Sequence, residues 1–174
     1  MPLTRIKSLG ITDGTIVNAD INASAAIAGT KLTGVGKILQ VSNLVEISTD
    51  QTLATATHTD LTSMSLSITP SSASNKILLV SNIQCKLDSG DGFGLSYVRD
   101  STTIAYSGAN SGENYSALYD GSSFILVTLP FIYIDSPSTT SAITYKIQAS
   151  SYSSRSINFA DGGKQTFYAM EIAV

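Results

Sequence analysis

Few side chains in this sequence are of types that perform chemistry on their own. His58 is the single histidine among 174 residues, so a histidine-based triad, dyad or metal cluster would have to be built around it. It lies in the polar segment ATHTD, which we expect to be a loop before a strand. The single cysteine, Cys85, allows no intrachain disulfide or thiolate zinc site and is expected to be buried. We interpret His58 as a surface histidine.

The acidic residues suggest a metal site at one place. Asp88 and Asp91 are two carboxylates within the tight segment DSGDG, and a hard cation such as calcium is held by such oxygens. The later bidentate Glu of an EF-hand loop does not follow. Asp and Gly also suit plain turns, which is the interpretation we prefer. Asp88 and Asp91 stay as weak calcium candidates, and we expect no bound metal or other cofactor.

Glycoside hydrolysis is the second chemistry that carboxylates suggest, and it requires two of them at a defined separation across a cleft. Most acids of the chain instead fall in turn-like motifs, where bonding to the local backbone accounts for them: Asp13, Asp50, Asp100, Asp120, Asp135 and Asp161. Glu113, in the loop GANSGENYSALYDG, is the remaining candidate. We therefore predict a protein without enzymatic activity.

The segment 107–123 has a composition that favours recognition over catalysis. Tyr, Ser, Gly and Asn are typical of recognition loops, because Tyr offers a large contact area at low entropic cost. A glycan or protein contact would use residues from this loop and its surroundings, namely Tyr106, Asn110, Glu113, Tyr115, Tyr119, Tyr152 and Arg155. The alternative is a solvent-exposed loop whose tyrosines pack back onto the domain or between subunits.

Near the start of the chain, the segment 9–32 reads LGITDGTIVNADINASAAIAGTKL. Its large aliphatic residues recur about every five positions from Ile11 onward, which fits neither the helix nor the strand period. They are Leu9, Ile11, Ile16, Ile21, Ile27 and Leu32. A short helical turn is expected over 25–28, and only neighbouring molecules could stabilise it. We predict that residues 1–36 form an extended arm that lies against identical copies or a larger assembly.

The composition of the chain is typical of an antiparallel β domain. Charged residues make up 13% of the chain, against about 25% in average proteins, and about a quarter of the residues are Ser or Thr. The net charge of −3 and the scattered Lys and Arg argue against a nucleic-acid partner. The N-terminus has no continuous apolar core of about 7 to 15 residues, as a signal peptide contains, and no run approaches the roughly 20 residues of a bilayer span. We therefore expect no signal peptide and no membrane partner.

Alternating apolar and polar residues predict about eight to ten short strands over 37–174. They are expected at 39–47, 63–68, 77–87, 93–97, 103–106, 115–119, 124–134, 143–149, 157–159 and 168–174. The strand at 77–87 is apolar on both sides at its start, which predicts a central position. The run at 124–134 suits a trimer interface or a buried strand equally well, and Pro130 predicts an edge, a bulge or a switch between sheets there. The predicted fold is an all-β antiparallel sandwich at 37–174 behind the arm at 1–36.

Several segments of the sequence resemble segments of one class of proteins. The segment ITDGTIVNADINASAAIAGTKL is similar to one found in fibre and virion surface proteins of tailed bacteriophages, cyanophages and other marine phages among them. The phrases SLSITPSSASNKILLVSNI, SYVRDSTTIAYSG and FIYIDSPSTTSAITYKIQ also resemble the C-terminal domains of these proteins. The resemblance implies a jelly-roll-like domain in a trimeric structural protein on the virion surface.

Within that resemblance, the shortness of the arm favours a capsid decoration protein, either a cement protein or a head fibre. Its arm would bind the major capsid protein or another virion protein, and closed symmetry would suit a homotrimer. One alternative is a receptor-binding tail-fibre tip that contacts a host surface glycan or protein. The other is a stand-alone, lectin-like glycan-binding module.

Overall fold

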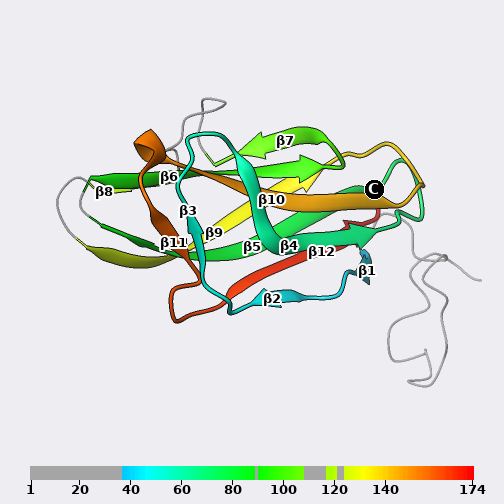
Figure 1. Cartoon of the computed structure of the whole chain (residues 1–174). Helices are drawn as coiled ribbons and strands as arrows, with labels where there is room; N and C mark the ends of the chain where they lie inside the picture. The colour runs from blue at the N-terminus through cyan, green and yellow to red at the C-terminus, as the bar shows by residue number, and fades with distance from the viewer. Residues whose placement is uncertain (1–36, 89, 108–116, 121–123) are drawn as a thin grey trace, which may run out of the picture. The chain divides into compact units, whose positions relative to one another are not determined.

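The computed structural model of the chain describes residues 37–88, 90–107, 117–120 and 124–174 (Figure 1). The chain divides into two units, Met1–Val35 and Gly36–Val174, and the described residues belong to the second. The predicted arm, with its helical turn, lies outside the described residues and stays a prediction.

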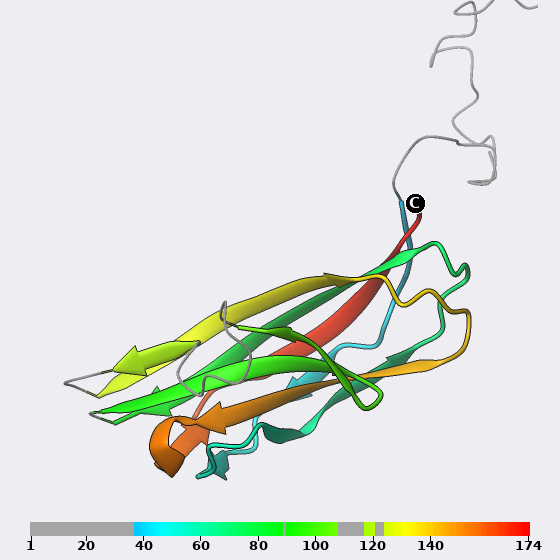
Figure 2. The ribbon, with the colours of Figure 1, turned by 90° about the horizontal axis from the view of Figure 1, so that it is seen from above.

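The described residues form two antiparallel sheets, which pack face to face as a sandwich (Figures 1 and 2). Sheet A contains β1 (Ile38–Val41), β2 (Val45–Ile47), β3 (Gln51–Leu53), β5 (Lys76–Leu87), β9 (Ile125–Asp135), β11 (Ile157–Phe159) and β12 (Gln165–Ile172). Sheet B contains β4 (Thr59–Ile68), β6 (Asp91–Arg99), β7 (Thr102–Tyr106), β8 (Leu118–Asp120) and β10 (Ile143–Ser151). The predicted all-β antiparallel sandwich is therefore confirmed.

The order of the strands gives a jelly roll. The short strands β1 to β3 lie along β12 and β11, and β7 and β8 lie along β6, so each group acts as one interrupted strand. Sheet A then runs β1–β3, β11–β12, β5, β9, and sheet B runs β4, β10, β6, β7–β8. From β4 to β6 and again from β8 to β11 the chain crosses from one sheet to the other, which is the double Greek key of a jelly roll.

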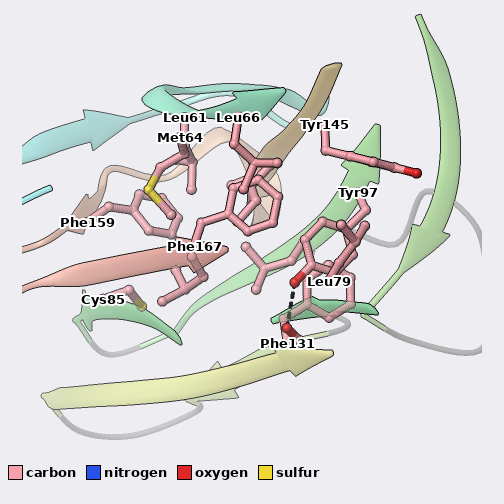
Figure 3. Packing of buried hydrophobic residues seen from close by; sticks show 14 of the residues in the cluster. Leu61, Met64, Leu66, Leu79, Cys85, Tyr97, Phe131, Tyr145, Phe159 and Phe167 are labelled. Atoms are coloured by element: carbon pink, nitrogen blue, oxygen red, sulfur yellow. Dashed lines mark hydrogen bonds between the residues drawn. The ribbon is translucent and has the colours of Figure 1, made fainter. Parts of the chain in front are cut away.

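The core fills the space between the sheets, and an aromatic stack joins them at its centre. Tyr97 of β6 lies between Phe131 of β9 and Phe167 of β12, with ring centroids 4.2 and 5.6 Å away. Its hydroxyl donates to the Phe131 carbonyl oxygen and lies 2.9 Å from the Ser81 hydroxyl (Figure 3). Burial raises the pKa of Tyr97, so this phenol stays neutral. Cys85 is fully buried in the same core, as predicted.

Most of the predicted strands are confirmed. β5 is central, with β12 and β11 on one side and β9 on the other. Pro130 lies in β9, which pairs with β5 alone among the described strands and is therefore an edge strand, one of the three predicted outcomes. β6 and β7, which correspond to the strands predicted at 93–97 and 103–106, pair as a hairpin.

The strand predicted at 39–47 is wrong in two respects. It is interrupted between β1 and β2, because Ser42 exchanges hydrogen bonds with Ala169 through both its backbone N–H and its hydroxyl, each 2.8 Å long. The alternation assigned Leu39 and Val41 to a half-buried face, but 38% and 56% of these residues are exposed. β3 was not predicted, since three residues are too few to show an alternation.

The two ends of the sandwich differ in what they carry (Figure 2). We call the end that holds Lys37 the proximal end. The carbonyl oxygen of Lys37 accepts a hydrogen bond from the backbone N–H of Ala173, near the C-terminus. The connections 69–75 and 136–142 lie at the same end. We call the other the distal end, with the connections 54–58, 88–90 and 152–156. The chain therefore enters the domain beside its own C-terminus.

Candidate functional site

The histidine lies before β4, as predicted, but it is not a plain surface residue. His58 is half-buried, and its Nδ1 lies 3.0 Å from the hydroxyl of Ser96. The ring meets the edge of Tyr106 with centroids 5.3 Å apart, and burial lowers the pKa of His58. Ser96 is completely buried, so it has no access to a substrate. This pair is a packing contact between β6, β7 and the distal end, and it lacks the exposure that nucleophilic catalysis requires.

The candidate calcium site is occupied by a side chain of the protein. The Asp91 carboxylate is buried and forms an ion pair with the guanidinium of Arg155 through Nε, and its other oxygen accepts the backbone N–H of Asp88 at 3.1 Å. Within the described ranges, no three His, Cys, Asp or Glu side chains are grouped as a metal site would require. The backbone N–H of Asp91 also donates to the Asp88 carbonyl oxygen at 3.0 Å.

The predicted recognition residues fall into separate groups. Asn110, Glu113 and Tyr115 lie outside the described residues, and only the backbone of Tyr119 is described, opposite Gly92. Tyr106 packs on His58, whereas Tyr152 and Arg155 belong to the connection after β10. The six arm positions also lie outside the described residues: Leu9, Ile11, Ile16, Ile21, Ile27 and Leu32.

The connection after β10 is the most unusual backbone at the distal end. It is a short 3₁₀ turn, η4 (Tyr152–Ser154), in which Ser153 and Ser154 both have positive φ, of 50° and 57°. Non-glycine residues seldom adopt such angles, and two in succession mark local strain. Arg155 follows directly and holds the turn to the start of β6 through Asp91.

Sequence reasoning missed two buried carboxylates at the proximal end. Asp135 was assigned to a turn, but it is buried and takes two bonds of 2.9 Å from Nη1 of Arg99 and one of 2.6 Å from the Tyr145 hydroxyl. Burial, with the hydrogen bond to Asp135 second, raises the pKa of Tyr145. Glu171 is completely buried and accepts four hydrogen bonds. Both carboxylates join elements distant in sequence, so their role is structural.

The largest feature of the surface is an apolar face on the outer side of sheet A. We define the apolar face by residues whose side chains point away from the core, on β1, β5, β9 and β12 and just before β9: Ile38, Val41, Leu78, Val80, Phe124, Leu126, Ile132, Ile134, Tyr168, Met170 and Ile172. Six of them are between 52% and 60% exposed: Ile38, Val41, Phe124, Leu126, Ile132 and Ile134.

The pairing register makes this face continuous. Paired residues of an antiparallel sheet lie side by side on the same face. One row across the sheet contains Ile134, Leu78, Met170 and Val41, and the next contains Ile132, Val80 and Tyr168. The run at 124–134, for which the sequence left an interface and a buried strand open, has one side toward the core and the other side exposed.

The outer side of sheet B has the opposite character. Along β4 and β10 it presents polar side chains: Asp60, Ser63, Ser65, Ser67, Thr144, Lys146 and Gln148. Asp60 receives hydrogen bonds of 2.8 Å from Lys146 and 2.7 Å from Gln148, and these bonds lower the pKa of its carboxyl group. One sheet of the sandwich is thus covered with hydroxyls and charges, whereas the other presents aliphatic side chains to its surroundings.

No family model matches the chain. No curated protein matches it either. Among solved structures, the chain is similar to the VP2 subviral particle protein of infectious bursal disease virus, with a TM-score of 0.42 and 11% sequence identity. The likeness covers 78% of this chain and 40% of that one. The jelly-roll assignment rests on the strand order and not on this likeness.

No helix in the described part of the chain is long and apolar enough to cross a bilayer. Among the described residues, the distal connections and the apolar face are the two surfaces from which we argue function.

Proposed function

We propose that this chain is a non-enzymatic structural protein of a bacteriophage virion, a trimeric capsid decoration protein of the cement or head-fibre kind. The observation that carries the proposal is the apolar face, because a jelly roll with one aliphatic outer sheet has the surface of an assembly component. The phage-like sequence segments, above all the one at 11–32, add the virion context. A protein of this kind acts by binding and reinforcing, for which no catalytic group is needed.

The arrangement of the ends suits such a role. The chain enters the domain at the proximal end, and the distal connections lie at the far end of strands up to 12 residues long. An arm at 1–36 bound to the major capsid protein or another virion protein would leave the domain standing above the particle. The protein would then lie on the virion surface.

A co-sedimentation experiment tests this proposal. The full chain is mixed with particles or emptied shells that lack it, and the pellet is compared with that of a variant carrying Ile16→Asp, Ile21→Asp and Ile27→Asp. The wild-type chain is expected to pellet with shells at a fixed ratio, and the arm variant is expected to stay in solution while keeping its folded β spectrum. Failure of the wild-type chain to bind any particle component would contradict the proposal.

A receptor-binding fibre tip is the second candidate, and η4 is the observation that favours it. Two strained serines next to Tyr152, with Arg155 held by Asp91, form a preorganised connection at the end opposite Lys37. A tip predicts that the purified protein adsorbs to host cells and blocks infection, and that Tyr152→Ala reduces both effects. A decoration protein would do neither, and its loss would leave fragile capsids. Binding to a glycan array without binding to shells would instead favour the lectin-like module.

A further inference from the structure

We infer that the apolar face is the subunit interface of this protein, and that its occupant is a second copy of the same chain. This inference deepens the proposed function, on which it rests, by assigning the trimer contact to the outer side of sheet A and not to the arm alone.

The extent of the face suits a permanent interface. It crosses four strands spaced about 4.8 Å apart and runs along about five residues of β5 and β12 at about 3.3 Å each, a footprint of about 300 Å². The continuation along β9 to Phe124 brings the total to about 400 Å². A standard interface covers about 800 Å² on each partner, with an apolar centre inside a polar rim. The apolar face therefore has the size expected of such a centre.

The rim residues are also present. Lys76 and Asn82 flank Leu78 and Val80 on the outer side of β5, and Thr128 lies on β9 between Leu126 and Pro130. Lys86 lies over the ring of Phe124, with its Nζ 5.4 Å from the ring centroid. No charged side chain lies inside the rows defined above, so the centre offers nothing that would select a charged partner. Obligate contacts between copies of one chain are the interfaces with this apolar character.

The β9 edge of sheet A favours contacts between copies through their outer faces over pairing of their edge strands. β9 is an edge strand, and an exposed edge invites another strand to pair with it. Pro130 stands in the middle of β9 and has no backbone N–H to offer such a strand. Sheet extension through β9 is therefore interrupted, whereas its aliphatic side chains remain available on the outer face.

The shape of the face predicts how copies are arranged. β9 forms one margin of the face, and β12 with β1 forms the other. If the β9 margin of one copy lies against the β12–β1 margin of the next, each copy uses both margins, and such a head-to-tail contact forms a ring when the rotation between copies closes. A ring of three copies is what the proposed function requires.

The test is the mass of the full-length protein in solution, measured by light scattering and native mass spectrometry across a dilution series. Wild-type protein is compared with Ile132→Thr/Ile134→Thr, which keeps β-branched side chains in β9 but removes two half-exposed aliphatic groups. The matched control is Ser65→Thr/Ser67→Thr on the polar face of sheet B. We expect a multimer for the wild type and the control, and at least about a 100-fold weaker association for the β9 variant.

The outcomes separate the inference from the function on which it rests. A folded β9 variant that has the same multimeric mass as the wild type would overturn the inference. A wild-type protein that is monomeric at micromolar concentration would also overturn it. In that second case, residues 1–36 or another protein would cover the apolar face. A mass of two chains would support the inference and contradict the trimer. Should the variant fail to fold, hydrogen exchange of wild-type β9 decides: faster exchange on dilution supports the inference, and concentration-independent exchange overturns it.

Discussion

Replacing Glu171 by glutamine is expected to destabilise the domain strongly, although the change alters a single polar atom. The carboxylate is completely buried on β12, and the described residues give it no ion-pair partner. One oxygen accepts from the backbone N–H and the hydroxyl of Ser71 and from Asn75, at 2.7, 2.8 and 2.6 Å. The other accepts from Gln40 of β1 at 2.6 Å. Glu171 of β12 is therefore hydrogen-bonded both to β1 and to the connection between β4 and β5.

The size of the effect follows from the pKa of this group. Burial by itself raises the pKa of Glu171, but the hydrogen bonds from Asn75, Gln40 and Ser71 outweigh it and lower the pKa from 4.5 to about 2. This difference corresponds to about 3 kcal/mol of stability. Because the folded-state pKa is the lower one, the contribution is fully present above pH 4.5 and is lost as the pH falls toward 2. The amide of Glu171→Gln brings donors where four donors already converge, so it forfeits this contribution at neutral pH.

The assay is urea unfolding followed by circular dichroism at pH 7 and at several values down to pH 2, at one protein concentration. We expect the variant to lose about 3 kcal/mol at pH 7, or about 10 °C in Tm, and to approach the wild type at pH 2. Glu46→Gln is the matched control, since Glu46 is exposed and pairs with Lys164, and such pairs contribute at most about 1 kcal/mol. Two results would contradict this prediction. One is a Glu171→Gln variant that is as stable as Glu46→Gln at pH 7. The other is a wild-type protein that loses no more stability between pH 7 and pH 2 than the Glu171→Gln variant does.

Three further predictions concern the remaining buried groups. Asp135→Ala leaves the charge of Arg99 without its partner and is expected to cost about 3–5 kcal/mol in denaturant unfolding. Met64→Ala opens a cavity in the core, since Met64 is 1% exposed, and should cost about 2–5 kcal/mol, seen as a lower Tm. Removing divalent cations with a chelator is expected to leave Tm unchanged, because the Asp91 carboxylate is already paired with Arg155.

Each of these three predictions has a control or an outcome that would contradict it. Asp60→Ala serves as the exposed counterpart of the Asp135 variant, and equal losses from both would show that burial of the ion pair is unimportant. Met64→Leu should retain most of the stability that Met64→Ala loses, since volume-conserving changes are well tolerated. A chelator-induced fall in Tm that calcium restores would revive a cation site at the distal end.

The strands could be predicted from the sequence because most of them alternate. In β5, the residues Ile77, Leu79 and Ile83 share one face, and all three are fully buried. Alternation did not identify the buried face of a strand whose outer face is apolar and whose inner face mixes apolar and polar residues. In β12 the sequence directs attention to Tyr168, Met170 and Ile172, whereas the buried positions are Gln165, Phe167, Ala169 and Glu171.

The functional surface was less accessible to sequence reasoning, for a physical reason. An aliphatic residue on a strand signals that something covers it, but not whether the cover is its own domain or another molecule. The run at 124–134 therefore fitted a core strand and an interface alike. The exposure of Leu126, Ile132 and Ile134 in the folded domain shows that one face of this strand has no cover within the described residues. The buried carboxylates escaped for a similar reason, since Asp135 and Ser136 before Pro137 also look like a turn.

Electron microscopy of the intact particle would show directly whether this protein decorates the capsid as a trimer. We expect a surface density that fits three copies of the jelly roll, with the outer sides of their A sheets facing one another and the proximal ends toward the capsid. Particles made without the protein should lack this density alone. A reconstruction with no density for the domain, or with copies whose apolar faces point to solvent, would contradict the account.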